Sequence, residues 1–79
     1  MKARVTVMPA TGVLDPQAEA VLRALGSLGF DGVLGVRQGK VIELDLAESD
    51  PRRARDAVES MCIRLLANTV IESYMIEFP

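Results

Sequence analysis

The sequence predicts a small α+β domain whose strands and helices follow one another in the order β-α-β-β-α-β. Two segments begin at an Asp-Pro pair and then carry apolar residues at helical spacing on one face. The segments before, between and after them alternate apolar and polar residues, as half-buried strands do. With 79 residues the chain is long enough for one domain, so we expect residues 1–79 to form a single domain.

The first strand is expected at residues 2–8, where Val5 and Val7 alternate with other side chains, and Pro9 ends it. Asp15 can cap the first helix, and Pro16 suits its first position because no backbone N–H is needed there. Glycine typically ends a helix, and Gly29 follows the last apolar position. The apolar stripe of this helix consists of Ala18, Val21, Leu22, Leu25 and Leu28.

Strands two and three are predicted as a hairpin of residues 33–37 and 40–47, joined by Gln38 and Gly39. Asp50 and Pro51 begin the second helix, which we expect to end at Asn68 because asparagine tolerates a left-handed conformation. Its apolar stripe is the strongest periodic signal in the chain and consists of Ala54, Ala57, Val58, Met61, Cys62, Leu65 and Leu66.

The last strand is expected at residues 70–78, with Tyr74, Ile76 and Phe78 on one face. Two right-handed crossovers would place both one-sided helices on the same face of a four-stranded antiparallel sheet. This architecture is the ferredoxin-like plait, βαββαβ.

Composition argues against several classes of partner. The formal net charge is −2, so the chain has no general attraction for phosphate backbones, and we expect no nucleic-acid partner. No apolar run approaches the length of about 20 residues that a membrane span needs. The polar residues near Met1 leave no apolar core for a signal peptide. We therefore expect a cytoplasmic protein with no membrane partner.

The sequence offers no recognisable catalytic, cofactor-binding or metal-binding group. It has no histidine, which is the commonest general base and transition-metal ligand. Its single cysteine, Cys62, falls in the apolar stripe of the second helix, where a buried structural role is expected. Glycine-rich phosphate-binding signatures are absent. What remains is a domain that binds protein surfaces or a small regulatory ligand.

The candidate interface lies on the sheet face that the helices leave open. Met8, Val41 and Met75 would form one apolar patch there if their strands are neighbours, although scattered exposed apolar residues are also normal. Arg37 and Lys40 flank the predicted turn and would contact an acidic partner, or simply be solvated. Dimerisation through the sheet face and pairing through an edge strand both remain open.

Several short segments form a specific combination along the chain. They are Gly12-Val13-Leu14-Asp15-Pro16-Gln17, Leu28-Gly29-Phe30, Val36-Arg37-Gln38-Gly39-Lys40, Met61-Cys62, Leu65-Leu66-Ala67-Asn68, Val70-Ile71-Glu72 and Tyr74. Each segment is weak alone, but together they span nearly the whole chain, and in this order they resemble the PurS family, the small subunit of phosphoribosylformylglycinamidine (FGAM) synthase. Loop residues Ala10 and Thr11 depart from the family pattern as an insertion.

The resemblance implies a non-catalytic subunit of a glutamine-dependent, ATP-consuming ligase in purine biosynthesis. Such a subunit would bridge a glutaminase subunit and a synthetase subunit and assist ammonia transfer between them. ATP and Mg would be used by the synthetase partner, and this chain would bind no cofactor. The resemblance also implies that the chain pairs with itself, as a homodimer or a higher oligomer.

An ACT-type regulatory domain, which senses small molecules, is the alternative function. Domains of that type share the plait and bind amino acids near the first strand and first helix, where Gly12 and Asp15 are suitably placed. However, Asp15 followed by Pro16 is already explained as the start of a helix.

Overall fold

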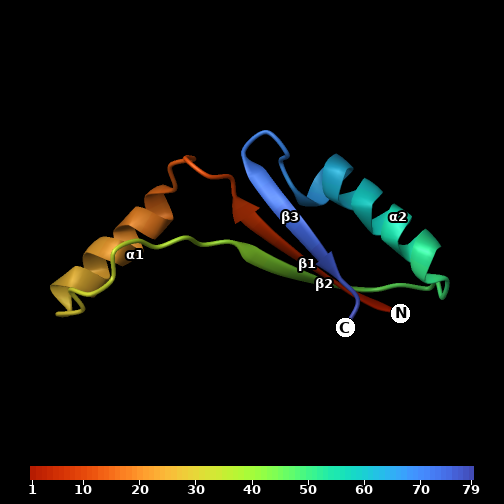
Figure 1. Cartoon of the computed structure of the whole chain (residues 1–79), viewed down its shortest axis with the longest axis horizontal. Helices are drawn as coiled ribbons and strands as arrows, with labels where there is room; N and C mark the ends of the chain where they lie inside the picture. The colour runs from red at the N-terminus through yellow and green to blue at the C-terminus, as the bar shows by residue number, and fades with distance from the viewer.

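The computed structural model describes residues 1–79 and confirms an α+β architecture, with three strands instead of the predicted four. The strands form one antiparallel sheet in the order β2-β1-β3 (Figure 1). No helix has the length and apolar character that crossing a membrane requires. The elements in chain order are β1 (Lys2–Pro9), α1 (Pro16–Ser27), β2 (Lys40–Asp45), α2 (Pro51–Met61), the π-helical segment η1 (Cys62–Leu66) and β3 (Glu72–Glu77).

The core lies between α2 and one face of the sheet, called the inner face below. Val5 at the centre of β1 is fully buried and is in register with Ile42 of β2 and Ile76 of β3. α2 packs on this face through buried residues that include Val58, which belongs to the same core cluster. The alternation that predicts β1 therefore places its valines correctly. The buried members of the cluster are Ala3, Val5, Val7, Val58, Cys62 and Ala67.

Both helices begin where the sequence predicts. The Asp15 carboxylate accepts a hydrogen bond from the backbone N–H of Gln17 at 2.9 Å, and the Asp50 carboxylate accepts one from Arg52 at 3.0 Å. Each satisfies a backbone donor that the first turn leaves without a partner. The predicted stop of α1 is also confirmed, because Gly29 adopts a positive φ of 94°.

α2 does not end as predicted. It widens into the π-helical segment η1, in which the N–H of Ala67 donates to the carbonyl of Cys62 at 3.0 Å. The chain then turns extended at Ala67, and no residue other than glycine has a positive φ. The left-handed role expected of Asn68 is therefore wrong. Its side chain instead accepts a hydrogen bond from the N–H of Val70 and forms a turn.

The predicted hairpin does not form. Residues 33–37 are not a strand, and the chain runs from α1 into β2 without reversing at Gln38 and Gly39 (Figure 1). A two-residue hairpin turn needs a positive φ at its first central residue, and neither Gln38 nor Gly39 has one. We call residues 30–39 the arm.

α1 does not cover the sheet, so the prediction of two helices on one face is wrong for the single chain. Because the arm does not turn back, α1 is held beyond the end of the sheet and makes no substantial contact with it or with α2 (Figure 1). The radius of gyration is 16.0 Å, whereas a compact chain of this length has about 12 Å. The chain by itself is open and elongated.

Candidate functional site

The predicted apolar patch is assembled on the face of the sheet opposite α2, called the outer face. Val41 of β2 and Met75 of β3 are both in register with Thr6 of β1, so these side chains form a row across all three strands. Met8 lies two residues further along β1 on the same face. Val41 and Met75 are each 59% exposed. We call Thr6, Met8, Val41 and Met75 the outer patch.

The other end of the outer face is charged. Arg4 is in register with Glu43 and Glu77, and its guanidinium lies 3.6 Å from the Glu43 carboxylate. Lys2 lies 3.8 Å from Asp45. These pairs are exposed, so each contributes little to stability. The outer face therefore presents an apolar half beside a charged half.

Arg37 and Lys40 do not belong to this patch. The Arg37 guanidinium donates a hydrogen bond to the carbonyl of Pro9 and so ties the arm to the end of β1. Lys40 is in register with Val7, so it lies on the inner face, opposite to Val41. The prediction that these two side chains form a basic hairpin tip is wrong because there is no hairpin.

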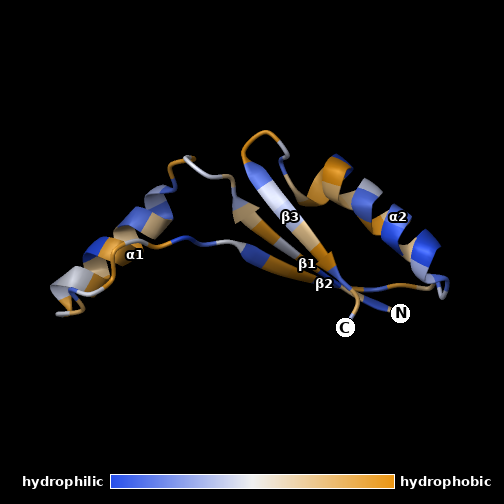
Figure 2. Ribbon diagram, in the orientation of Figure 1, coloured by the Kyte–Doolittle hydropathy of each residue, from blue (hydrophilic) through white to orange (hydrophobic).

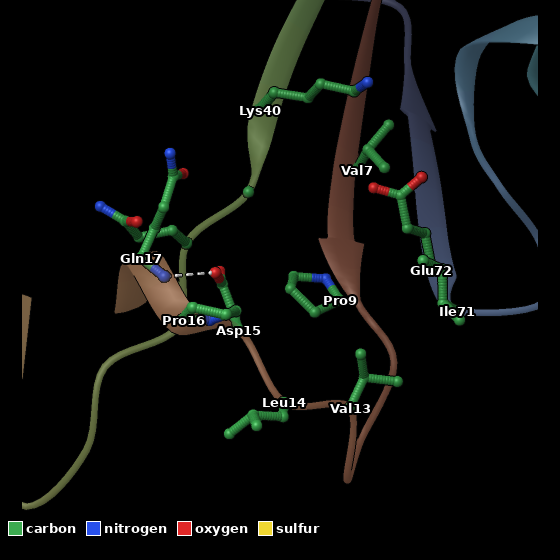
Figure 3. A pocket seen from close by; sticks show the side chains of 12 residues that line it. Val7, Pro9, Val13, Leu14, Asp15, Pro16, Gln17, Lys40, Ile71 and Glu72 are labelled. Carbon is green, nitrogen blue, oxygen red and sulfur yellow. Dashed lines mark hydrogen bonds between the residues drawn. The ribbon is translucent and has the colours of Figure 1, made fainter. Parts of the chain in front are cut away.

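A cavity of about 590 Å³ lies where β1 ends, α1 begins and β2 begins (Figure 3). Two carboxylates line it, but both already bind local backbone groups. Asp15 caps α1, and Glu72 accepts a hydrogen bond from the N–H of Asn68 at 2.7 Å. Gly12, which the regulatory-domain alternative would use, forms a turn with a φ of 85°. The two carboxylates of this cavity therefore stabilise the backbone at the start of α1 and just before β3.

A second concave surface lies on the inner face, between β2 and the end of α2. It has a volume of about 410 Å³. Its walls are mainly apolar, and Leu65 on its rim is 83% exposed. The periodic pattern predicts Leu65 as a core residue, but η1 turns it to the surface. We call this surface the inner groove; it is lined by Leu44, Ser60, Met61, Arg64, Leu65 and Leu66.

Cys62 is fully buried in the core cluster, as its place in the apolar stripe predicts. Burial raises the pKa of the Cys62 thiol above its ordinary value, and the Glu59 carboxylate raises it further. The thiol is therefore protonated at neutral pH and is a weak nucleophile. No three Cys, Asp or Glu side chains converge in a way that could hold a metal ion.

Comparison with known proteins identifies the family. The family described as "PurS: Phosphoribosylformylglycinamidine (FGAM) synthase" matches residues 2–79. The chain belongs to the PurS family. The PurS subunit of FGAM synthase from Synechocystis sp. is 51% identical over 73 residues, which cover 92% of this chain and 71% of that protein. A PurS chain is a subunit of FGAM synthase in purine biosynthesis.

Solved PurS structures share the open shape of this chain. Bacillus subtilis PurS, in a C2 crystal form, matches with a TM-score of 0.86 and 46% identity, covering 96% of this chain and 94% of that one. A chain in the structure of PurLQS from Thermotoga maritima matches with a TM-score of 0.86 and 30% identity, covering 96% and 93%. Matches of this extent include α1, so its position apart from the sheet is common to these PurS structures.

Proposed function

We propose that this PurS chain is a non-catalytic bridge between the glutaminase and ATP-dependent synthetase subunits of FGAM synthase. Its membership of the PurS family carries the proposal, and a relative from T. maritima occurs in a PurLQS structure. The proposal includes a cytoplasmic location and assigns ATP and Mg to the synthetase partner. The chain contributes interaction surfaces, namely the outer patch and the inner groove.

Ammonia transfer gives such a bridge a physical task. Ammonia is nucleophilic only while it is unprotonated, and release into water would protonate and dilute it. A protein that seals the junction between two active sites excludes water and keeps the nitrogen neutral. This task needs a surface complementary to both partners and does not require a reactive side chain.

The proposal also includes a homodimer as the working form of the chain. Only 8 of its 79 residues are buried, so the single chain leaves most of its apolar side chains in contact with solvent. Small domains with so little burial gain stability from association. Six of the exposed large apolar residues lie in the segments that flank α1: Val13, Leu14, Leu28, Phe30, Val33 and Leu34.

Bridging is tested by measuring FGAM synthesis by the two large subunits with and without this chain. We expect glutamine-dependent synthesis to fall when the chain is omitted. Synthesis from added ammonium salt should continue, because it needs no transfer between subunits. Equal glutamine-dependent rates with and without the chain would rule out a bridging role.

The outer patch is proposed as a surface that binds one of the large subunits. Val41→Lys places a charge at the centre of its apolar row and should reduce copurification of a partner subunit by at least tenfold. Ser49→Lys, in the exposed loop before α2, adds the same charge outside the patch and should have no effect. If Val41→Lys instead dissociates the homodimer, the outer face is the dimer interface.

A further inference from the structure

The outer patch holds two of the four methionines of this chain, Met8 and Met75. Met8 is in register with Ser73 of β3, and Met75 is in register with Thr6 of β1. The two methionines are therefore diagonal neighbours on one face of the sheet, with less than about 8 Å between their Cβ atoms. Met75 is 59% exposed, and Met8 is half-buried. Both thioethers thus belong to one surface that has no covering element within the chain.

The two residues that flank Met8 are too small to cover its thioether. Ser73 lies on one side. On the other side, Gly39 falls opposite Met8 when the register of β1 and β2 is continued by one residue. A Cβ atom built on Gly39 would collide with the Met8 sulfur, so this sulfur occupies the space that glycine leaves free. The Met8 thioether therefore rests in a notch of the outer face.

The outer patch is apolar apart from the hydroxyl of Thr6. Figure 2 shows hydrophobic residues in all three strands, whereas α2 is largely hydrophilic. A partner that covers the outer patch therefore has to match it with apolar groups, and such a partner supplies few hydrogen-bond donors. A polar oxygen introduced on this surface would lose its water on binding without gaining a new partner, which disfavours binding.

Methionine thioethers can acquire such an oxygen from a peroxide. The sulfur lone pair attacks one oxygen of hydrogen peroxide, the O–O bond breaks and an S–O bond forms. The proton of the transferred oxygen moves to the other oxygen, which leaves as water, so the sulfur loses two electrons and the peroxide gains them. Methionine sulfoxide reductases reverse the change. Cys62 does not compete, because its thiol is fully buried and protonated.

We propose that Met8 and Met75 form a peroxide-sensitive modification site, whose oxidation to sulfoxides lowers the affinity of the outer patch for a large subunit of FGAM synthase. Each sulfoxide turns a flexible apolar side chain into a polar one at the surface that the partner covers. Because the two residues are diagonal neighbours, both oxygens disturb the same part of the contact. This inference rests on the proposed docking of the outer patch and is independent of ammonia transfer.

Copurification before and after peroxide treatment tests the site. The chain is treated with hydrogen peroxide, then with catalase and dithiothreitol, and its sulfoxides are mapped by mass spectrometry. We expect sulfoxides at Met8 and Met75 and at least tenfold lower recovery of the partner subunit. Methionine sulfoxide reductases should restore the recovery. Full recovery with a chain that carries both sulfoxides, or no oxidation at these two residues, would overturn the inference.

Two sets of substitutions locate the sensitive sulfur atoms. Met8→Leu with Met75→Leu keeps apolar side chains but removes both sulfur atoms from the outer patch. The matched control, Met61→Leu, removes a methionine that lines the inner groove. Each protein is compared with its own untreated sample. Peroxide should lower partner recovery less than threefold for the double variant and at least tenfold for Met61→Leu, and an equal loss in both would place the sensitive group elsewhere.

Circular dichroism of the treated and untreated chain should be the same. If peroxide unfolds the chain, the loss of binding comes from unfolding and the inference fails. If Val41→Lys lowers partner recovery but peroxide does not, the outer patch docks a large subunit and only the oxidation site is wrong. If Val41→Lys has no effect, the proposed docking and this inference both fail.

Protection in the complex gives a second test that needs no substitution. Met75 should be oxidised at least tenfold more slowly when the partner subunit is bound than in the free chain. Met1, which is 39% exposed and lies outside the outer patch, serves as the internal reference and should change less than twofold. Equal rates at Met75 in the free and bound chain would show that the partner leaves this thioether uncovered, and would overturn the inference.

Discussion

Gly39 lies so close to the carbonyl oxygen of Val7 that a side chain at position 39 has no room. A Cβ atom built there would collide with this oxygen and with the sulfur of Met8. The contact lies where the arm joins β2, immediately before Lys40 pairs with Val7. Glycine is needed here for close approach of two backbones and not for an unusual φ.

Gly39→Ala should therefore destabilise the protein. The methyl group would push the start of β2 away from β1, at a cost of about 1–3 kcal/mol. Gly35→Ala is the matched control, because no atom lies within 4 Å of the added carbon and φ is not positive. Urea unfolding should show little change for the control, within about 0.5 kcal/mol. Equal midpoints for the two variants would contradict the close contact.

The cap of α2 gives a second prediction. Asp50 accepts a hydrogen bond from the N–H of Arg52 and also lies 3.8 Å from the Arg53 guanidinium. Asp50→Ala should lower the free energy of unfolding by about 1 kcal/mol, because a backbone donor loses its partner. Arg53→Ala removes only an exposed ion pair and should cost less than about 0.5 kcal/mol. If both variants lost a similar amount of unfolding free energy, the ion pair and not the helix cap would be responsible for the effect.

The packing of α2 on the sheet gives a third prediction. Val58 is 0% exposed and belongs to the same core cluster as Val5. Val58→Ala should lower the free energy of unfolding by about 1–3 kcal/mol, because it leaves a cavity. Val70→Ala removes the same atoms from a side chain that is 85% exposed and should change little. If both variants unfold at the same urea concentration, α2 does not pack on the sheet as described.

Local signals predict most elements of this chain correctly. Asp15 and Asp50, each followed by proline, fix the helix starts because capping involves only neighbouring residues. The alternation in β1 fixes which face each side chain occupies, so Val41 and Met75 fall on the predicted face once the strands pair. The widening of α2 at Cys62 has no comparable signal in the sequence, so the exposure of Leu65 is not predicted.

The hairpin prediction fails for a physical reason. Gln38 and Gly39 have the composition of a turn, but composition does not tell whether a segment pairs with its own chain or stays extended. Two other errors follow from this one, whereas the errors at Asn68 and Leu65 come from the widening of α2 into η1. Arg37 and Lys40 are misplaced because they were expected to flank the turn, and α1 is misplaced because only the turn would return the chain to its own sheet.

Burial of Cys62 predicts a loss of stability at alkaline pH. The pKa of the thiol is raised in the folded protein, first by burial and then by Glu59, whereas the unfolded chain keeps the ordinary pKa of about 8.5. As pH rises past that value, the unfolded state loses its proton first. The free energy of unfolding therefore falls. The thiol contributes its full stabilisation at pH values below its pKa in the unfolded chain. This stabilisation is lost as the pH rises towards the pKa of the thiol in the folded protein.

Cys62→Ala isolates this effect because it removes the titrating group and leaves every other ionisable side chain in place. The variant should be less stable at pH 7, since it leaves a cavity in the core. Between pH 8 and pH 10, however, urea unfolding under reducing conditions should show a shallower decline for the variant than for the parent chain. The difference in the free energy of unfolding between the parent chain and the variant should shrink over this range. The decrease should reach up to about 1.4 kcal/mol for each unit by which folding raises the pKa of the thiol. Parallel curves would show that the thiol ionises equally in both states and that the site around Cys62 is open to water.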